Sequence, residues 1–347
     1  EEPSIPILSL RMAWTAGETN DPDGLEGLTN AMVYHMNEGA GELDAQAFFK
    51  GMEELNMSFS CGASNESTYC NASMLTDNAG ASFDMIALAF AEPRFDDGPF
   101  ERFKREQEVS LQTRETNPQY LASRARADAL YPDHAYARET NAESLAALTQ
   151  DAMRAQKDML MVQDGMLVTA VGAMSPEELA PLIDKAVSGL PETSETAETS
   201  DVVLAAPAPA PVIIELPQPQ SLVTFAAPAM TREDPDFYTA DVLNYTFGGG
   251  GFESRLMKDL RVAKGLTYGI YTQVSSQDKI QLWSGGGQTK NESASEFIAG
   301  SKENMSAMVA EGMTEDELAA AKAYLTGSYP LGFDSNAKIA ARMMGVR

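Results

Sequence analysis

Apolar residues recur at helical spacing in several long stretches of the chain and alternate with polar residues in shorter ones. Apolar positions three and four residues apart predict helices at 78–91, 97–116, 140–158 and 291–311. The segments GMLVTAVG (165–172) and QLWSGGG (281–287) predict strands. Because strands in hairpins are flanked by long helices, we expect mainly antiparallel sheets with helices packed on one face.

Two further helix starts have a polar signature. Ser175 is followed by Pro176 and Glu178, and Thr314 is followed by Glu317. A hydroxyl residue and an acid three positions later cap a helix reciprocally, and proline is well tolerated at the first helical position. Both segments should therefore begin helices.

One order of elements occurs twice along the chain. The segment 24–60 predicts helix, glycine-containing loop, helix and strand, and the segment 237–273 repeats that order, with Gly249 in the place of Gly39. A duplicated unit of this kind predicts an α+β fold of two homologous domains, each a mainly antiparallel sheet with helices on one face.

A change of composition separates the two copies. The stretch LPETSETAETSDVVLAAPAPAPVIIELPQP (190–219) is acidic, then rich in Ala and Pro, and has too little periodicity for a core element. We therefore predict an N-terminal domain at 1–189, a linker at 190–211 and a C-terminal domain at 212–347.

Length and charge narrow the class of protein. A chain of 347 residues exceeds the size at which a single core keeps growing, which favours two domains. Its 25 Lys and Arg stand against 51 Asp and Glu, a net charge of −26 that repels nucleic acid and anionic membranes. No apolar run approaches the length of a membrane span. The acids either keep the surface solvated or attract basic substrates, and both interpretations stay open.

The two cysteines lie in MSFSCGASNESTYCNASML, which alternates like two strands around a turn at Asn65 and Glu66. That register places Cys61 opposite Cys70. A cross-strand disulfide would favour an oxidising compartment, so we expect a periplasmic or otherwise exported protein. Two small buried thiols explain the sequence about as well, and then a cytoplasmic location is the alternative.

The stretch FGGGGFESRLMKDLRVAKGLTY (247–268) is the most unusual in the chain. A phosphate-binding loop would need Lys followed by Ser or Thr after its last glycine, and Phe252 and Glu253 stand there instead. The glycines more simply let two helices approach closely at a sharp angle. Phe252, Leu256 and Leu260 then predict one apolar face on the second helix.

Behind that helix, Gly265 predicts its end and LTYGIYTQV predicts a strand. Arg261 is then expected in the last helical turn and Tyr268 early in the strand, so the two side chains can face one pocket.

The whole string resembles the second-domain signature of the insulinase/pitrilysin zinc metallopeptidases, in their processing-peptidase-like branch. The matching residues are Gly250, Gly251, Ser254, Arg255, Leu256, Leu260, Arg261, Gly265, Leu266 and Tyr268. The resemblance implies that Arg261 and Tyr268 complete an active site from the domain without metal, and that Gly250 and Gly251 contribute to substrate binding. A phenol can donate to the oxyanion of a tetrahedral intermediate, and a guanidinium can hold a carbonyl or carboxylate.

That family binds zinc through an inverted HxxEH motif on a first-domain helix and a later Glu. In the corresponding stretch GLEGLTNAM, the three motif positions hold Gly27, Asn30 and Ala31, and none of them can bind zinc. We expect them on one helical face, opposite Leu25, Leu28, Met32 and Met36.

The chain has only two histidines, and neither stands at a position of the zinc motif. His35 is expected to be satisfied or solvent-facing, and His134 lies in a loop to which no catalysis is assigned. Glu106 and Glu108 fall near the region that supplies the third zinc ligand in active relatives, and without histidines they predict a solvated helix face. No metal is therefore expected in this chain.

The resemblance implies a subunit that is inactive alone and completes a heterodimeric zinc metallopeptidase for peptide substrates. Zinc is then expected in a homologous, HxxEH-bearing partner subunit. Two alternatives remain: a catalytically inactive structural or scaffolding relative, and a peptide-binding module.

Overall fold

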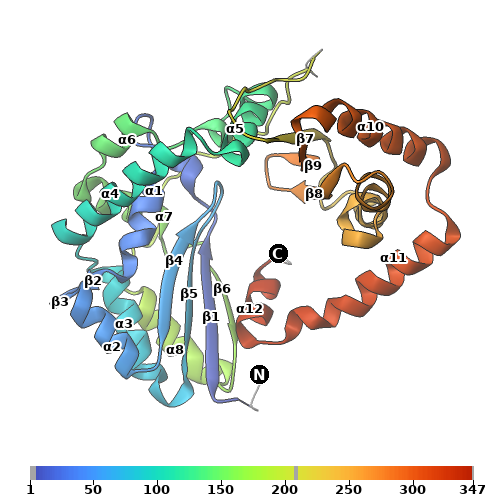
Figure 1. Cartoon of the computed structure of the whole chain (residues 1–347). Coiled ribbons are helices and arrows are strands. Elements are labelled where there is room, and N and C mark those ends of the chain that lie inside the picture. Colours follow the sequence, from blue (N-terminus) through green and yellow to red (C-terminus); the bar gives the residue numbers. More distant parts are fainter. Residues whose placement is uncertain (1–4, 207–209, 346–347) are drawn as a thin grey trace. The chain divides into compact units, whose positions relative to one another are not determined.

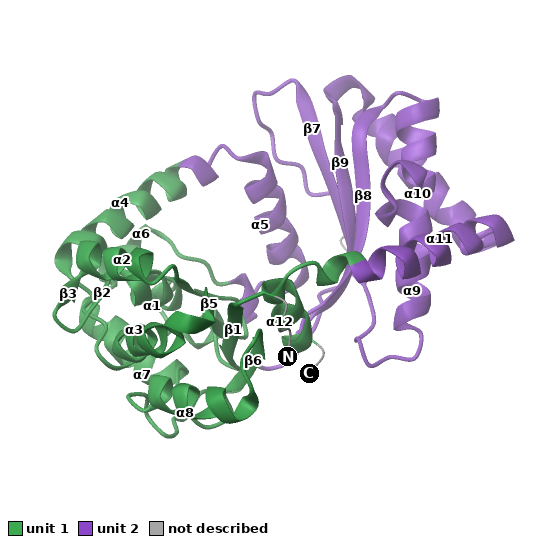
Figure 2. Ribbon diagram, turned by 90° about the horizontal axis from the view of Figure 1, so that it is seen from below, with its two compact units in different colours: residues 1–112, 138–199, 331–347 green, residues 113–137, 200–330 purple. Residues whose placement is uncertain are grey.

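The computed structural model describes residues 5–206 and 210–345, which form two compact units that interleave along the chain (Figure 2). Unit 1 contains residues 1–112, 138–199 and 331–347, and unit 2 contains residues 113–137 and 200–330. Each unit has its own sheet and its own apolar core. The domain boundaries predicted at 189 and 212 follow the internal repeat and stay a prediction.

The main sheet of unit 1 is antiparallel, with the strand order β4-β5-β1-β6 (Figure 1). Its strands are β1 (Ile7–Trp14), β4 (Ser58–Ala63), β5 (Thr68–Leu75) and β6 (Leu167–Val171). Leu8, Leu10 and Met12 of β1 are buried on one face, as the two-residue period of a strand requires. A separate short hairpin joins β2 (Gly39–Ala40) to β3 (Leu43–Asp44).

Helices cover the core face of this sheet, and one helix lies on the other face. They are α1 (Leu28–Tyr34), α2 (Ala45–Glu54), α3 (Ala79–Ala91), α4 (Asp97–Arg114), α6 (Ala142–Ala147), α7 (Gln150–Leu160), α8 (Pro176–Val187) and α12 (Asn336–Met344). On the face away from the core, the Thr169 hydroxyl donates to the Ala340 carbonyl (2.8 Å) and Asn336 Nδ2 donates to the Ile7 carbonyl (2.9 Å). These two bonds hold α12 against β1 and β6 (Figure 1).

Unit 2 has a three-stranded antiparallel sheet in the order β7-β9-β8. Its strands are β7 (Gln220–Pro228), β8 (Thr267–Ser276) and β9 (Gln281–Lys290), and its α-helices are α5 (Pro118–Leu130), α9 (Phe237–Asn244), α10 (Ala294–Glu311) and α11 (Glu315–Ser328). Phe297 of α10 reaches the central strand at Gly287, where a Cβ would lie 3.1 Å from its ring. Glycine in β9 therefore lets α10 pack closely on the sheet.

The predicted fold class is confirmed, with differences in detail. The helix predicted at 140–158 is broken, because the Thr149 side chain accepts from the Ala152 N–H and starts α7 after α6 has ended. The two predicted capping boxes are present, at Ser175 with Glu178 and at Thr314 with Glu317.

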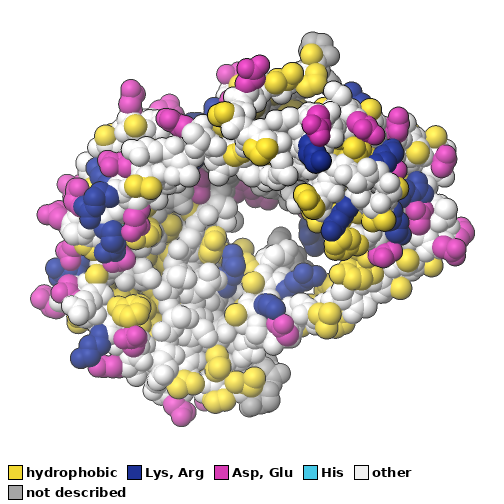
Figure 3. Space-filling model, viewed as in Figure 1, with side chains coloured by type: hydrophobic (Ala, Val, Ile, Leu, Met, Phe, Trp, Pro, Cys, Tyr) yellow, Lys and Arg dark blue, Asp and Glu magenta, His cyan; other side chains and the backbone are white. Residues whose placement is uncertain are grey.

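Acidic side chains do not gather in one place on the face shown in Figure 3. Asp and Glu (magenta) are scattered over the helices of both units. A dispersed negative surface keeps a chain solvated without creating one strongly attractive patch. None of the described helices combines the length and the apolar character that crossing a bilayer requires.

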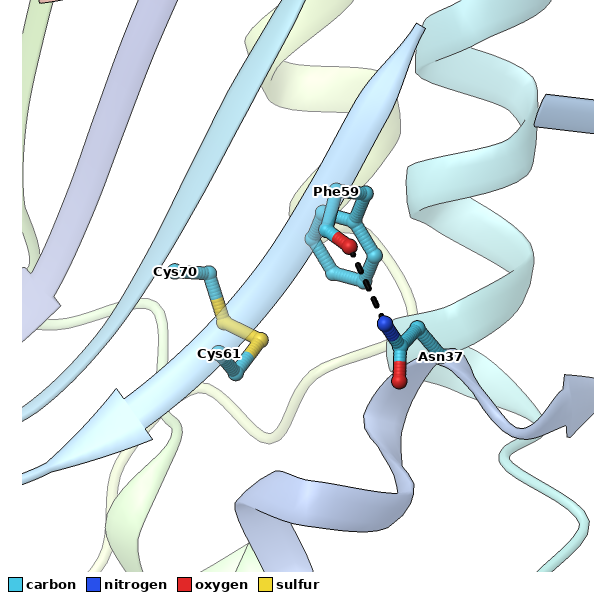
Figure 4. Close-up of a disulfide and its surroundings, with 4 residues drawn as sticks. All are labelled: Asn37, Phe59, Cys61 and Cys70. Carbon is cyan, nitrogen blue, oxygen red and sulfur yellow. Dashed lines mark hydrogen bonds between the residues drawn. A yellow bond between two sulfur atoms is a disulfide. The ribbon is translucent and has the colours of Figure 1, made fainter. Parts of the chain in front are cut away.

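A disulfide joins Cys61 of β4 to Cys70 of β5, which are directly paired in the sheet (Figure 4). Cys70 is fully buried in the core of unit 1. Close by, Asn37 Nδ2 donates to the Phe59 carbonyl on the side of β4 that β5 does not cover (3.2 Å). The structure therefore contains the cross-strand disulfide, and not the two buried thiols that were the alternative.

We expect the double substitution Cys61→Ala and Cys70→Ala to lower the free energy of unfolding by about 2 to 3 kcal/mol, because opening a short loop restores entropy to the unfolded chain. Urea unfolding of the oxidised protein and of the variant measures the difference. The neighbouring register pair Ser60 and Asn71, changed together to Ala, is the matched control. An unchanged urea midpoint after reduction of the wild type would contradict the expectation.

Candidate functional site

The glycine run of unit 2 forms a tight passage between α9 and the sheet. After α9 the chain continues as a π-helical turn at Tyr245–Gly249 and a 3-10 turn at Gly251–Glu253. A Cβ on Gly248 would lie 2.4 Å from the Thr272 hydroxyl on β8, and Gly251 has a φ of +58°. Gly248 thus permits a close approach to the sheet, and Gly251 permits a left-handed turn. This supports the interpretation of the run as a structural device.

A second π-helical segment, Met257–Ala263, carries Arg261 in its last turn. Gly265 ends this segment with a φ of +64°, and its N–H donates to the Arg261 carbonyl (3.2 Å). Tyr268 is the second residue of β8 and is 84% exposed. The predicted positions of Arg261 and Tyr268 are therefore confirmed, whereas their shared role at one pocket stays a prediction.

The start of β8 contains a bulge that affects its tyrosines. The register of β8 with β9 shifts between Thr267 and Ile270. At the bulge, the Thr267 hydroxyl accepts from the Gly269 N–H (3.0 Å) and donates to the Gln288 carbonyl (2.6 Å). Because one residue is inserted, Tyr268 and Tyr271 are both exposed although they are three positions apart.

The side chain of Arg261 stacks on an aromatic ring. Its Cζ lies 4.3 Å from the centroid of the Phe252 ring. Phe252 is 60% exposed, while Leu256 and Leu260 are fully buried. The predicted apolar face of residues 252, 256 and 260 is thus wrong at Phe252, because the helix begins only after the 3-10 turn and Phe252 lies outside its periodicity.

The neighbouring arginine of the same signature, Arg255, has a structural role. Its Nε donates to Glu317 Oε1 (2.7 Å), and its Nη2 donates to Glu317 Oε2 (2.6 Å) and to the Gly312 carbonyl (2.8 Å). This bidentate pair ties the segment behind the glycine run to the first turn of α11. The guanidinium of Arg255 lowers the pKa of Glu317 to about 2.

We expect Glu317→Gln to reduce the acid sensitivity of the protein. The folded-state pKa of Glu317 lies below its ordinary value of 4.5, so the pair stabilises the fold fully above that value and is lost as the pH falls toward 2. At neutral pH the variant should lose about 1 to 2 kcal/mol of unfolding free energy. Urea unfolding between pH 7 and pH 2.5 measures both effects, with the exposed Glu315→Gln as control. Parallel pH profiles for Glu317→Gln and wild type would contradict the assignment.

In unit 1, the stretch aligned with the zinc motif has a backbone that differs from a continuous helix. Gly27 is the residue before α1 and has a φ of +97°. A Cβ there would lie 2.4 Å from the Thr140 hydroxyl. Ala31 is fully buried, and Asn30 is exposed. The predicted single face of the three positions is therefore wrong, because α1 begins only at Leu28 and Ala31 packs into the core.

The start of α1 is held by Asp21, which sequence analysis did not single out. Its carboxylate accepts from the N–H groups of Gly27 (2.8 Å) and Thr29 (2.9 Å) and from Gln156 Nε2 (3.2 Å). Burial raises the pKa of Asp21, which these hydrogen bonds oppose. A buried capping network of this kind fixes the left-handed backbone at Gly27.

Arg102 of α4 pairs with one acid that follows α1 and lies near a second acid on α4 itself. Arg102 pairs with Glu38 (2.7 Å) and lies 4.0 Å from Glu106, whose carboxylate also accepts from the Tyr34 hydroxyl (3.3 Å). Glu108 is exposed, so the predicted solvated face holds for it, whereas Glu106 is exposed but paired. Sequence analysis missed Arg102, although its spacing of four residues from Glu106 on one helix is a signal.

Each of the two histidines contacts a backbone carbonyl through a ring nitrogen. His35 is fully buried, with Nδ1 2.6 Å from the Ala31 carbonyl and the rings of Phe100 and Phe103 at its edges. Burial lowers the pKa of His35. His134 is held in its loop by the Ser200 carbonyl (2.8 Å). Within residues 5–206 and 210–345, no three His, Cys, Asp or Glu side chains gather where they could hold a metal.

Zinc therefore does not fit the described part of this chain. The motif positions offer no ligand, and the space that a side chain at Gly27 would need belongs to Thr140. Of the acids near α1, Asp21 is used by the hydrogen bonds that start the helix, and Glu38 and Glu106 pair with Arg102.

Models of known protein families match both the N-terminal and the C-terminal part of the chain. The family model described as "Insulinase (Peptidase family M16)" matches residues 2–144, and the model described as "Peptidase M16 inactive domain" matches residues 147–325. A crystal structure of a peptidase M16 inactive domain from Pseudomonas fluorescens superposes with a TM-score of 0.91 at 26% identity, covering 98% of this chain and 82% of that one.

Two curated relatives cover nearly the whole chain. The "Non-peptidase homolog YmxG" of Helicobacter pylori is 24% identical over 94% of this chain and 76% of its own length. The "Uncharacterized zinc protease YmxG" of Bacillus subtilis is 20% identical over 96% of this chain and 81% of its own length. The Helicobacter pylori name and the "inactive domain" descriptions support the expectation that the chain is inactive by itself, whereas the Bacillus subtilis relative is named a zinc protease. The chain thus belongs to the insulinase family, peptidase family M16, as a homologue whose own sequence lacks the HxxEH zinc motif.

Proposed function

We propose that this chain is the non-zinc subunit of a heterodimeric M16 metallopeptidase and contributes Arg261 and Tyr268 to hydrolysis of peptide bonds. One observation carries the proposal. In a chain whose sequence lacks the HxxEH motif, the guanidinium of Arg261 has no carboxylate partner among the described residues, and Tyr268 is 84% exposed. An exposed phenol and a guanidinium without an ion pair both keep donors that an external group can use.

The two side chains have complementary abilities. The Tyr268 phenol can donate one hydrogen bond to the oxygen that becomes negative as the scissile carbonyl turns tetrahedral. The Arg261 guanidinium presents a planar set of donors that suits a substrate carbonyl or carboxylate. Gly250 and Gly251 lie beside this surface in the tight turn, and a Cβ at Gly251 would meet only open space, so the backbone there is accessible to a peptide.

The partner of the proposed heterodimer is a homologous subunit that carries the HxxEH motif. In such a subunit, zinc and the motif Glu would supply the activated water. The contribution of this chain is confined to binding the peptide and to donating hydrogen bonds as charge develops.

Reconstitution tests the proposal. The purified chain is mixed with an HxxEH-bearing M16 subunit from the same cell, and cleavage of a fluorogenic peptide library is followed with and without a zinc chelator. We expect the mixture to cleave peptides in a zinc-dependent way and each chain alone to be nearly inactive. Stoichiometric zinc in the isolated chain, together with peptide turnover, would overturn the proposal.

A structural or scaffolding role is the second candidate, and one observation favours it. The motif region has not only lost its ligands but is closed by Thr140 and by the Asp21 network. A scaffold predicts a stable complex with a partner but identical peptide turnover by that partner in its presence and absence. Saturable peptide binding by the isolated chain, without any zinc, would instead indicate a peptide-binding module.

We also propose an exported, periplasmic location, because the Cys61–Cys70 disulfide persists most readily under oxidising conditions. Cell fractionation combined with thiol labelling tests this. Recovery of the chain in the cytoplasm with both thiols free would contradict it.

A further inference from the structure

We propose that Phe252 is a positioning residue that holds the guanidinium of Arg261 in the orientation needed to receive a peptide. The inference deepens the proposed function and rests on it. It assigns a role to the residue that directly follows the glycine run, which is exposed although it is a large aromatic.

Stacking is the contact that Arg261 makes through its guanidinium. The Cζ atom lies 4.3 Å from the centroid of the Phe252 ring, well within the range of a cation–π interaction. A guanidinium lying on a ring is held in place while the donors in its plane stay free. Phe252 can therefore restrict the motion of Arg261 without using any of its N–H groups.

The acids nearest in sequence are held by other cations. Glu253 pairs with Lys258 (3.0 Å), and Asp259 pairs with Lys264 (2.9 Å) and accepts from Asn304 Nδ2 (2.7 Å). The local pairing keeps Arg261 available for an external carbonyl or carboxylate.

Arg255, in the same short segment, differs from Arg261 because its guanidinium is paired. Its guanidinium is engaged by Glu317 and by the Gly312 carbonyl, and its side chain is largely buried. Arg255 is thus used to build the fold, and Arg261, six residues later, is used by neither the core nor an ion pair of the described chain. The exposed ring of Phe252 lies against Arg261.

The position of Phe252 follows from the backbone before it. The left-handed turn at Gly251 and the 3-10 turn at Gly251–Glu253 interrupt the helical path ahead of Ser254. The Ser254 hydroxyl donates to the Gly251 carbonyl (2.8 Å) and stabilises this turn. The glycine run therefore also sets where the stacking ring lies.

The first experiment needs only this chain. Arginine Nε–Hε resonances of the full chain are recorded by NMR, and Arg261→Lys identifies the signal of Arg261. We expect that signal to carry a ring-current shift that Phe252→Leu removes and Phe252→Tyr retains. Phe49→Leu, at an equally exposed phenylalanine on α2, should leave it unchanged. A signal unaffected by Phe252→Leu would overturn the stacking.

The second experiment uses the reconstituted heterodimer. We expect Phe252→Leu to lower kcat/KM by about two- to fivefold, the size of an exposed cation–π interaction. Phe252→Tyr should retain nearly full kcat/KM, and Phe252→Leu should have no further effect in an Arg261→Gln background. An undiminished effect in that background would overturn the positioning role. No cleavage by the wild-type mixture would overturn the proposed function and with it the role, while the NMR result would still decide the stacking.

Discussion

The triple substitution Gly27→His, Asn30→Glu and Ala31→His, which writes the HxxEH motif at its aligned positions, is expected to yield a destabilised protein without bound zinc. A histidine at Gly27 would have to adopt a φ of +97° and collide with Thr140. A histidine at Ala31 would overpack a fully buried site. Backbone strain and overpacking each cost about 1 to 3 kcal/mol, so we expect a loss of about 3 kcal/mol or more.

Thermal unfolding and metal analysis after dialysis against zinc measure the two parts of this prediction. Asn30→Glu alone is measured beside the triple variant and is expected to lose less stability, although it removes the hydrogen bond of Asn30 to Glu18 and places a carboxylate there. A triple variant that unfolds like the wild type and holds one zinc per chain would show that the stretch before α1 is adaptable after all.

Tyr268→Phe in the reconstituted heterodimer is expected to lower kcat by about 10²- to 10³-fold, the effect of removing one oxyanion donor. The ring is retained, so peptide binding should change little and the loss should fall on kcat. Steady-state kinetics with a fluorogenic peptide separates kcat from KM.

Tyr271→Phe provides a closely matched control for that measurement. Tyr271 lies on the same strand, beyond the bulge, and is also exposed, at 53%. Loss of its hydroxyl should leave kcat within a factor of about two, as for most exposed positions. Equal kinetics for Tyr268→Phe and wild type would remove Tyr268 from the reaction and favour a scaffolding role.

Much of the fold follows from local patterns that the sequence displays directly. Reciprocal capping at Ser175 and Thr314 needs only residues three positions apart, and the pairing of Cys61 with Cys70 needs only two alternating strands and a turn. Arg261 and Tyr268 were placed correctly because Gly265 separates a helical from an extended pattern. Interactions within about ten residues are therefore well predicted.

The errors arise where distant segments decide the outcome. Periodicity could not reveal that Phe252 precedes its helix and is exposed, since the 3-10 turn depends on the close approach of Gly248 to β8. The conformation of Gly27 depends on Asp21 and on Thr140, more than a hundred residues away. Placement of α12 on the second face of the sheet likewise depends on hydrogen bonds to β1 and β6 at sequence separations of 329 and 171 residues.

The contact between Gly27 and Thr140 has a consequence for how such a protein changes over generations. Restoring a histidine at the first motif position is harmful while Thr140 remains, and replacing Thr140 brings no benefit while the other two positions are still non-ligating. A histidine at the first motif position therefore requires both a change at Thr140 and a different backbone at residue 27.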